Sequence, residues 1–168
     1  GGYLLPGLWD MHTHLPKKKK NDFGYEQYLA LNFLSGVTNI RNMRSFDSIS
    51  HVTRKIENKS ILSPNIYFTP PPITKNNHPS IDSIQFYTKK YTSEGFKHWK
   101  ILGLPNKDYF DTLAKYTKEH QLKLVGHISK SVGIKESIMG GYSCIEHLQG
   151  YNKLLSDTLM FEEIIQLT

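Results

Sequence analysis

Apolar residues recur along the chain in six short runs with the character of β-strands. The runs are rich in β-branched and aromatic residues and are bounded mainly by Gly, Pro, Asn or Asp, as strands commonly are. Side chains alternate between the two faces of a strand, so runs of this length favour strands that are at least half buried. We therefore expect strands at residues 4–11, 37–41, 65–69, 96–102, 122–128 and 142–148.

Between these runs, apolar residues take the three- and four-residue spacing of amphipathic helices. The clearest helix has Phe110, Leu113 and Ala114 on one side. Gly36 follows another predicted helix, in the position that glycine often takes after a last turn. The pattern predicts helices at residues 25–34, 47–59, 81–91, 108–120, 132–139 and 156–166, with a long loop over residues 70–79.

Strands that alternate with helices predict parallel βαβ units, because a crossover helix returns the chain to the same edge of the sheet. Successive strands are about 20–30 residues apart, as in a (β/α) barrel. We therefore predict an α/β fold, a partial (β/α)8 TIM barrel of about six βα units, in one domain over residues 1–168. An open sheet exposes its first and last strands, so we also expect oligomerisation or poor solubility through these edges.

Composition limits the class of protein. The chain has 168 residues, a mass of 19.4 kDa and a hydrophobic fraction of 38%, which suit one soluble domain with a core. No apolar run approaches the roughly 18 residues of a membrane span, so no membrane association is expected. The N-terminus shows neither Met nor the pattern of a signal peptide, which leaves the compartment open between the cytoplasm and export after removal of a signal. Cys144 is the single cysteine, which excludes an internal disulfide and a cysteine zinc site.

The formal charge of +6 comes from 21 Lys and Arg against 15 Asp and Glu, and it raises the question of an anionic partner. Four of the lysines form one run, Lys17 to Lys20, and the others are scattered along the chain. A nucleic-acid-binding surface more often interleaves basic and aromatic residues. We interpret the run as a solvated loop and expect no nucleic-acid partner.

The most informative polar residues are His12 and His14. In an extended strand they lie on one face, where two imidazoles can hold one metal ion. Asp10 precedes them on the same face and is a candidate acceptor that would orient a ligand histidine. Taken alone, the pair is equally consistent with two ordinary polar residues at a strand end.

Three further candidates come near the ends of later predicted strands: Lys100, His127 and His147. An α/β barrel gathers functional residues at this end of its strands, so residues distant in the chain can meet there. Each candidate has a structural alternative. A lysine at a strand end can extend its ammonium group to water, and a single histidine is more often hydrogen-bonded than metal-bound.

Several segments together resemble the amidohydrolase superfamily, and most closely its imidazolonepropionase and Xaa-Pro dipeptidase (prolidase)-like branch. Pro-Gly-Leu-Trp-Asp-Met-His-Thr-His-Leu at residues 6–15 resembles the strand-one signature. Residues 36–43 resemble the second strand of the branch, which usually has Asp at the place of Asn42. Trp-Lys-Ile at residues 99–101, Gly-His at 126–127 and Ile-Glu-His at 145–147 are similar to its fourth, fifth and sixth strands.

This resemblance implies a site for one or two divalent metal ions, with His12, His14, Lys100, His127 and His147 as ligands. Zinc is the default metal, and manganese, iron or cobalt suits the same donors. The resemblance also implies that CO2 carboxylates Lys100 and that the carbamate bridges two ions. That reaction needs a buried lysine that reacts as a neutral amine.

The implied reaction is hydrolysis of a carbon-nitrogen bond in a small amide, cyclic amide or dipeptide by a metal-bound hydroxide. The resemblance places the general base, an Asp, at the end of an eighth strand, which we expect beyond Thr168; no catalytic residue is assigned within the chain. The last strands and the flanking β-sandwich of such enzymes are likewise expected outside it. His78 resembles the last residue of a Gly-Gly-His segment, which makes it a candidate substrate-binding residue or a solvated loop histidine.

Three functions stay open from the sequence. The first is a metal-dependent hydrolase of the amidohydrolase superfamily. The second is a truncated, catalytically inactive barrel fragment with a binding or structural role. The third, a basic nucleic-acid-binding module, is the least favoured because the charge is scattered.

Overall fold

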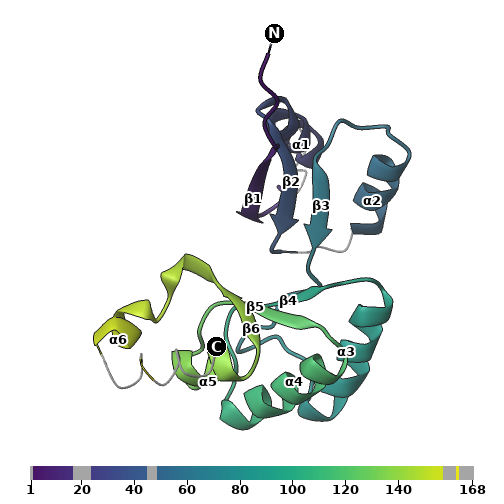
Figure 1. The fold of residues 1–168 in the computed structure, drawn as a ribbon. Coiled ribbons are helices and arrows are strands. Elements are labelled where there is room, and N and C mark those ends of the chain that lie inside the picture. Colours follow the sequence, from purple (N-terminus) through teal and green to yellow (C-terminus); the bar gives the residue numbers. More distant parts are fainter. Residues whose placement is uncertain (1, 17–23, 45–48, 157–161, 163–168) are drawn as a thin grey trace. The chain divides into compact units, whose positions relative to one another are not determined.

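The computed structural model describes residues 2–16, 24–44, 49–156 and 162. The chain divides into two compact units, Gly1–Thr69 and Pro70–Thr168 (Figure 1). Each unit has its own three-stranded parallel sheet and its own apolar core. Among the residues that the structure describes, every helix is too short or too polar to cross a lipid bilayer.

The first unit contains three strands and two helices in the order of parallel βαβ units. The elements are β1 (Leu8–Thr13), α1 (Tyr25–Leu34), β2 (Val37–Asn42), α2 (Ile49–Glu57) and β3 (Asn65–Phe68). The sheet order is β1-β2-β3, and both pairings are parallel. This is the arrangement that the alternating pattern predicts.

Both helices of the first unit pack on one face of its sheet. Leu29 of α1, Ile40 of β2 and Val52 of α2 are fully buried in one apolar cluster. Elsewhere on the sheet, Trp9 of β1 stacks on Tyr67 of β3, with ring centroids 5.2 Å apart, and both rings are exposed. The core of the first unit therefore lies on the helix side of the sheet.

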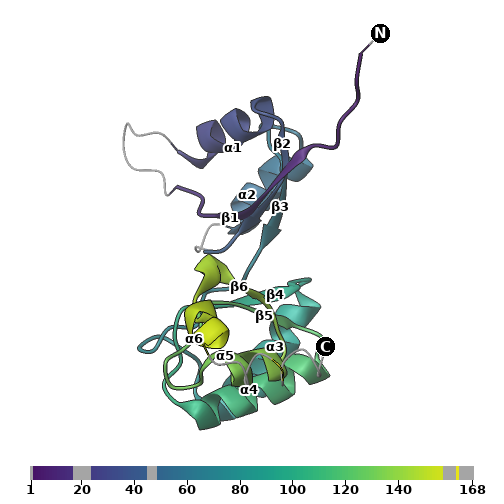
Figure 2. The same cartoon turned by 60° about the vertical axis from the view of Figure 1, so that its left-hand side comes forward.

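The second unit repeats the pattern with three more strands. Its elements are η1 (Ile81–Ser83), α3 (Ile84–Ser93), β4 (His98–Ile101), α4 (Lys107–Glu119), β5 (Lys123–Gly126), α5 (Ile134–Met139), β6 (Tyr142–Ile145), η2 (Glu146–Leu148) and α6 (Tyr151–Ser156). The sheet order is β4-β5-β6, again with parallel pairing. Helices α3 and α4 lie against one face of this sheet (Figures 1 and 2).

The core of the second unit forms between that face and the two helices. Trp99 and Ile101 of β4 pack there with Phe110 and Leu113 of α4. All four side chains are at most 2% exposed. The apolar side predicted for α4 is therefore its buried side.

The start of the loop after β3 is hydrogen-bonded to both units. On the side of the first unit, the Thr69 N–H and hydroxyl donate to the Asn42 carbonyl oxygen at 3.3 and 3.4 Å. On the side of the second unit, the Trp99 indole N–H donates to the Pro71 carbonyl oxygen at 3.0 Å. Ile73 then forms a parallel bridge with Ile101 of β4. The predicted irregular loop thus begins as a short extension of the second sheet.

Some boundaries differ from those predicted. The first strand begins at Leu8 rather than at residue 4, because the segment before it is exposed and unpaired with the sheet. The last strand ends at Ile145, because Glu146–Leu148 form a single 3-10 turn. The predicted helix at residues 156–166 lies almost wholly outside the described residues. The six predicted strands are present, in two sheets, and the parallel α/β class is confirmed.

Candidate functional site

The C-terminal end of β1 carries the first histidine pair. Asp10 pairs with Ile40 and Thr13 pairs with Asn42, so the two residues between them in β1 face a single residue of β2. A register shift of this kind places an extra residue in one strand and turns its side chains, as a β-bulge does. His14 lies one residue beyond the end of the strand. Simple alternation along a strand therefore does not describe this pair.

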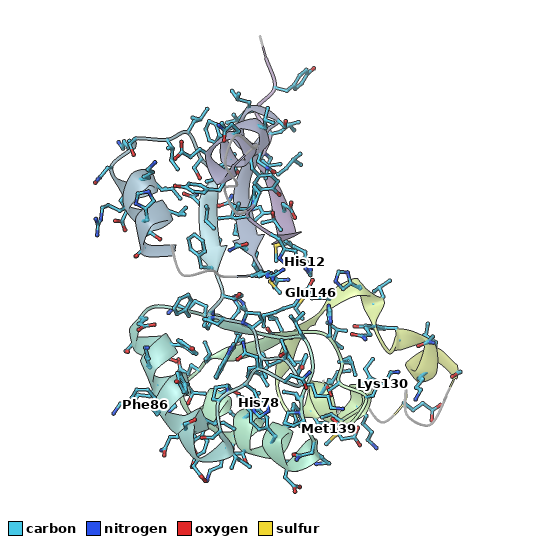
Figure 3. All side chains as sticks on the ribbon, turned by 180° about the vertical axis from the view of Figure 1, so that it is seen from behind. His12, His78, Phe86, Lys130, Met139 and Glu146 are labelled. Carbon is cyan, nitrogen blue, oxygen red and sulfur yellow. The ribbon has the colours of Figure 1, made fainter. Side chains whose placement is uncertain are left out.

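The rings of His12 and His14 nevertheless lie together. Their centroids are 5.1 Å apart and the rings meet edge to face. His12 is half-buried, and Figure 3 shows it at the end of β1. The structure thus brings the two predicted ligands of the first unit into contact.

Side chains fix the backbone that leads into this pair. The Arg41 Nε–H donates to the Met11 carbonyl oxygen at 2.8 Å, and the Arg41 side chain is buried. The Asp10 carboxylate accepts from the backbone N–H of His12 at 3.0 Å. Asp10, predicted as an acceptor for a ligand ring, holds the backbone at His12. Arg41 is a residue that the sequence pattern does not single out.

Thr13, between the two histidines, faces the helix layer. Its side chain is buried and its hydroxyl hydrogen-bonds with the Tyr28 hydroxyl of α1. Its carbonyl oxygen accepts from the backbone N–H of Met43 at 2.9 Å. The residue between the candidate ligands is therefore anchored on both its side chain and its backbone.

Lys100 is the buried candidate of the second unit. It lies on β4 between Trp99 and Ile101, whose side chains pack toward the helices, so it projects from the other face of the sheet. Its side chain is only 1% exposed. Lys100 pairs with Val125, and Val125 pairs with Cys144, so these three residues form one row across the sheet. The burial that carboxylation of Lys100 would require is present.

His127 follows β5 directly and depends on the glycine before it. Gly126 has φ of +127°, and a Cβ atom there would overlap the carbonyl oxygen of Ile101. The close approach allows the His127 N–H to donate to that oxygen at 2.8 Å. The Gly-His order is thus a requirement of backbone packing at the end of β5.

His147 reaches the second pair from a strained turn. It has φ of 60° and ψ of 22°, a left-handed conformation that costs a non-glycine residue about 1–2 kcal/mol. Its ring centroid lies 5.2 Å from that of His127. Strain of this kind persists where the surrounding structure fixes it.

Two side chains hold the backbone around the second pair. The Tyr142 hydroxyl donates to the His127 carbonyl oxygen at 3.1 Å, and burial raises the pKa of Tyr142, which keeps it a neutral donor. The Gln149 amide oxygen accepts from the Ile128 N–H at 3.0 Å. Gln149 thus links the segment after β6 to the residue that follows His127.

His78, the candidate substrate residue, makes different contacts. Its Nδ1 lies 2.8 Å from the carbonyl oxygen of Pro79, so Nδ1 carries the proton. His78, labelled in Figure 3, meets the ring of Tyr109 of α4 edge to face, with centroids 4.9 Å apart. Burial raises the pKa of the Tyr109 hydroxyl. His78 itself is exposed to solvent, whereas the Tyr109 ring that it contacts is buried.

Comparison with solved structures shows what this arrangement is similar to. A bottromycin amidohydrolase matches with a TM-score of 0.71 and 17% identity, over 87% of this chain and 33% of that one. A putative prolidase from Bifidobacterium longum matches with a TM-score of 0.60 and 20% identity, over 84% and 40%. The A. niger ochratoxinase matches with a TM-score of 0.61 and 16% identity, over 85% and 47%.

The chain has the fold of part of these solved structures. The resemblance found in the sequence motifs therefore agrees with the fold. The chain spans one third to just under one half of the length of these three structures. No family model matches the sequence, and no curated protein matches it significantly.

Both histidine pairs lie at the carboxyl ends of parallel strands, where α/β barrels place their functional residues. Imidazole nitrogens suit zinc and neighbouring transition metals, so the donor set fits a divalent ion. No three His, Cys, Asp or Glu side chains gather around one point within the described ranges. Each pair thus offers two ligands, and a zinc ion needs at least one more.

A surface cavity of about 410 Å³ in the second unit is separate from these pairs. Its lining comes from the end of α4, the start of β5 and the turn after α5, at the opposite end of the strands from His127. The lining residues are Thr117, Lys118, Gln121, Leu122, Lys123, Met139, Gly140 and Gly141. None of the predicted ligands is among them.

Proposed function

We propose that this chain is the metal-binding part of a hydrolase of the amidohydrolase superfamily that cleaves a carbon-nitrogen bond in a small amide, cyclic amide or dipeptide. The observation that carries the proposal is the contact of two histidine rings at strand ends in each unit, 5.1 and 5.2 Å between centroids, in an amidohydrolase fold. Histidines placed at random would rarely form two such ring contacts at the carboxyl ends of strands, where α/β barrels place their functional residues.

In this proposal the five predicted ligands, His12, His14, Lys100, His127 and His147, hold one or two divalent ions, with zinc as the default. Such an ion supplies Lewis-acid polarisation of the substrate carbonyl. The chain's own contribution is to hold the imidazoles at fixed positions and to keep the Lys100 side chain away from water. The partial barrel and the carboxylation of Lys100 belong to the same proposal.

Metal analysis of protein purified without chelator tests the proposal. We expect about one or two equivalents of a divalent transition metal per chain. Replacing either pair by alanine, as His12→Ala with His14→Ala or His127→Ala with His147→Ala, is expected to remove most of it. Less than about half an equivalent in the unaltered protein would count against an intact site.

A matched control is available on α2. His51 is exposed on that helix and belongs to neither pair, so His51→Ala removes one imidazole without touching the proposed ligands. Its metal content should equal that of the unaltered protein. Equal loss in His51→Ala and in the pair variants would show that the metal binds surface histidines non-specifically.

Hydrolysis assays separate the proposed enzyme from the second function, a barrel fragment with a binding or structural role. A panel of N-acyl amino acids, cyclic amides and Xaa-Pro dipeptides should show turnover that is lost with chelator and restored by metal. Metal bound at both pairs without turnover of any of these substrates would favour the fragment.

A further inference from the structure

Asn42 is the last residue of β2, and its side chain is completely buried. Its Oδ1 accepts a hydrogen bond from the backbone N–H of Leu15 at 3.1 Å, and its Nδ2 donates one to the Arg44 carbonyl oxygen at 3.0 Å. Leu15 directly follows His14. The amide of Asn42 therefore joins the end of β2 to the segment that carries the first histidine pair.

The position of His14 makes this link consequential. Up to Thr13, pairing with β2 orders the backbone of β1, and the last bond of that kind runs from the Met43 N–H to the Thr13 carbonyl oxygen at 2.9 Å. His14 lies beyond it. The Leu15 N–H is bonded to Asn42, so these two bonds lie on either side of His14.

The two bonds of the Asn42 side chain require one acceptor and one donor, which an amide has and an ionised carboxylate lacks. Aspartate has nearly the same shape, but its second oxygen would face the Arg44 carbonyl oxygen with no proton between them. A buried polar atom without a partner is costly, and a buried charge is more so. The contacts therefore select Asn over Asp, although the strand motif that this segment resembles usually has Asp.

We infer that Asn42 is a positioning residue for the His12 and His14 pair, and that it holds His14 in place before a divalent cation binds. The inference rests on the proposed function, because it assigns the pair to a metal. It adds a specific requirement for an amide at position 42, which the five-ligand site alone does not contain.

The test compares Asn42→Asp with Asn65→Asp. Asn65 lies at the exposed start of β3, so the same chemical change there is a matched control in the same sheet. Zn2+ affinity is measured by competition with a chromophoric chelator, and His12→Ala identifies the contribution of this pair. We expect Asn42→Asp to weaken Zn2+ binding about 10–100-fold, as loss of a partner that orients a ligand does, and Asn65→Asp to leave it unchanged.

A second control separates positioning from general loss of stability. Val52→Ala opens a cavity in the core of the first unit and lowers stability without removing either hydrogen bond of the Asn42 side chain. It should retain wild-type Zn2+ affinity wherever the protein is folded. In the metal-free protein, the imidazole NMR signals of the pair should shift in Asn42→Asp and remain in place in Val52→Ala.

Two results overturn the inference in distinguishable ways. Equal Zn2+ affinity in Asn42→Asp and Asn65→Asp removes the positioning role and leaves the proposed metal site standing. Unchanged Zn2+ binding in His12→Ala removes the metal site, and the positioning role with it.

One measurement on the unaltered protein applies even where Asn42→Asp does not fold. Amide exchange of Leu15, followed by NMR without metal, should be as slow as that of the β2 amides, because its N–H is bonded to a buried acceptor. Exchange of Leu15 at the rate of an open loop would overturn the inference.

Discussion

At the scale of single residues, the second histidine pair depends on a glycine. Gly126 brings the backbone of β5 against the carbonyl oxygen of Ile101, and the following N–H bonds to the same oxygen. Both features need a residue without Cβ and with a positive φ. The position of His127 is thus set by the backbone before it, rather than by its own side chain.

We predict that Gly126→Ala destabilises the second unit by about 2–6 kcal/mol, the sum of conformational strain and overpacking. Urea unfolding followed by Trp99 fluorescence measures the change. Gly95→Ala is the control, because Gly95 has a φ of +86° with open space around it. It should cost only the strain of a left-handed residue, about 1–2 kcal/mol. Equal costs at the two glycines would contradict the importance of the contact with Ile101.

At the scale of elements, the sequence pattern predicts helices α1 to α5 well, misses α6 (Tyr151–Ser156), and predicts the ends of strands β1 and β6 poorly. The bounds of α1 agree with the prediction because a run of helix-forming residues and the following Gly36 mark it locally. The register shift in β1 is less local, since it accompanies the bond from Arg41 to Met11. The left-handed turn at His147 likewise depends on the packing of β6 beside β5. The candidate ligands and their order along the chain could be read from the sequence. The ring contact between His127 and His147 could not, because it depends on these backbone details.

Three tyrosines that pack in the core of the second unit, Tyr91, Tyr109 and Tyr142, make the stability of this unit depend on pH in the alkaline range. Burial raises the pKa of Tyr91 to about 12 and also raises the pKa of Tyr109 and Tyr142. An unfolded tyrosine ionises near pH 10. Between about pH 10 and 12 the unfolded state therefore binds fewer protons than the folded state, so stability falls as pH rises, and the full contribution is present below pH 10.

We expect the free energy of unfolding of the second unit, measured through Trp99 in a Trp9→Phe variant, to decrease steadily above pH 10. The ring of Tyr91 meets that of Trp99 edge to face at 5.0 Å, so ionisation there should also quench the emission. Tyr91→Phe should reduce the slope. If the free energy of unfolding of Tyr91→Phe falls with pH as steeply as that of the parent, groups other than Tyr91 cause the pH dependence.

At the scale of the whole molecule, the two units have separate cores and each contains one of the two tryptophans, Trp9 and Trp99. Each tryptophan therefore reports on one unit when the other is replaced by Phe. If the proposed five ligands hold one ion, that ion would bind only when both units are folded, and it would couple their folding free energies.

We predict that the unfolding transitions seen by Trp9 and by Trp99 coincide with Zn2+ present and separate when a chelator removes it. Urea titrations of Trp9→Phe and Trp99→Phe, each with and without metal, provide the measurement. The His51→Ala background should behave like the parent. Transitions that stay apart with Zn2+ bound would mean that each unit binds metal by itself.

Hydrogen bonds at the start of the loop after β3 limit the length of free chain that joins the two units. Thr69 is bonded into the first unit and Pro71 into the second, so the free chain between these anchors is Pro70, whose ring fixes φ. In polymer terms the tether has almost no contour length to lose. The connection between the two units therefore contributes little loop entropy to the folding of the chain.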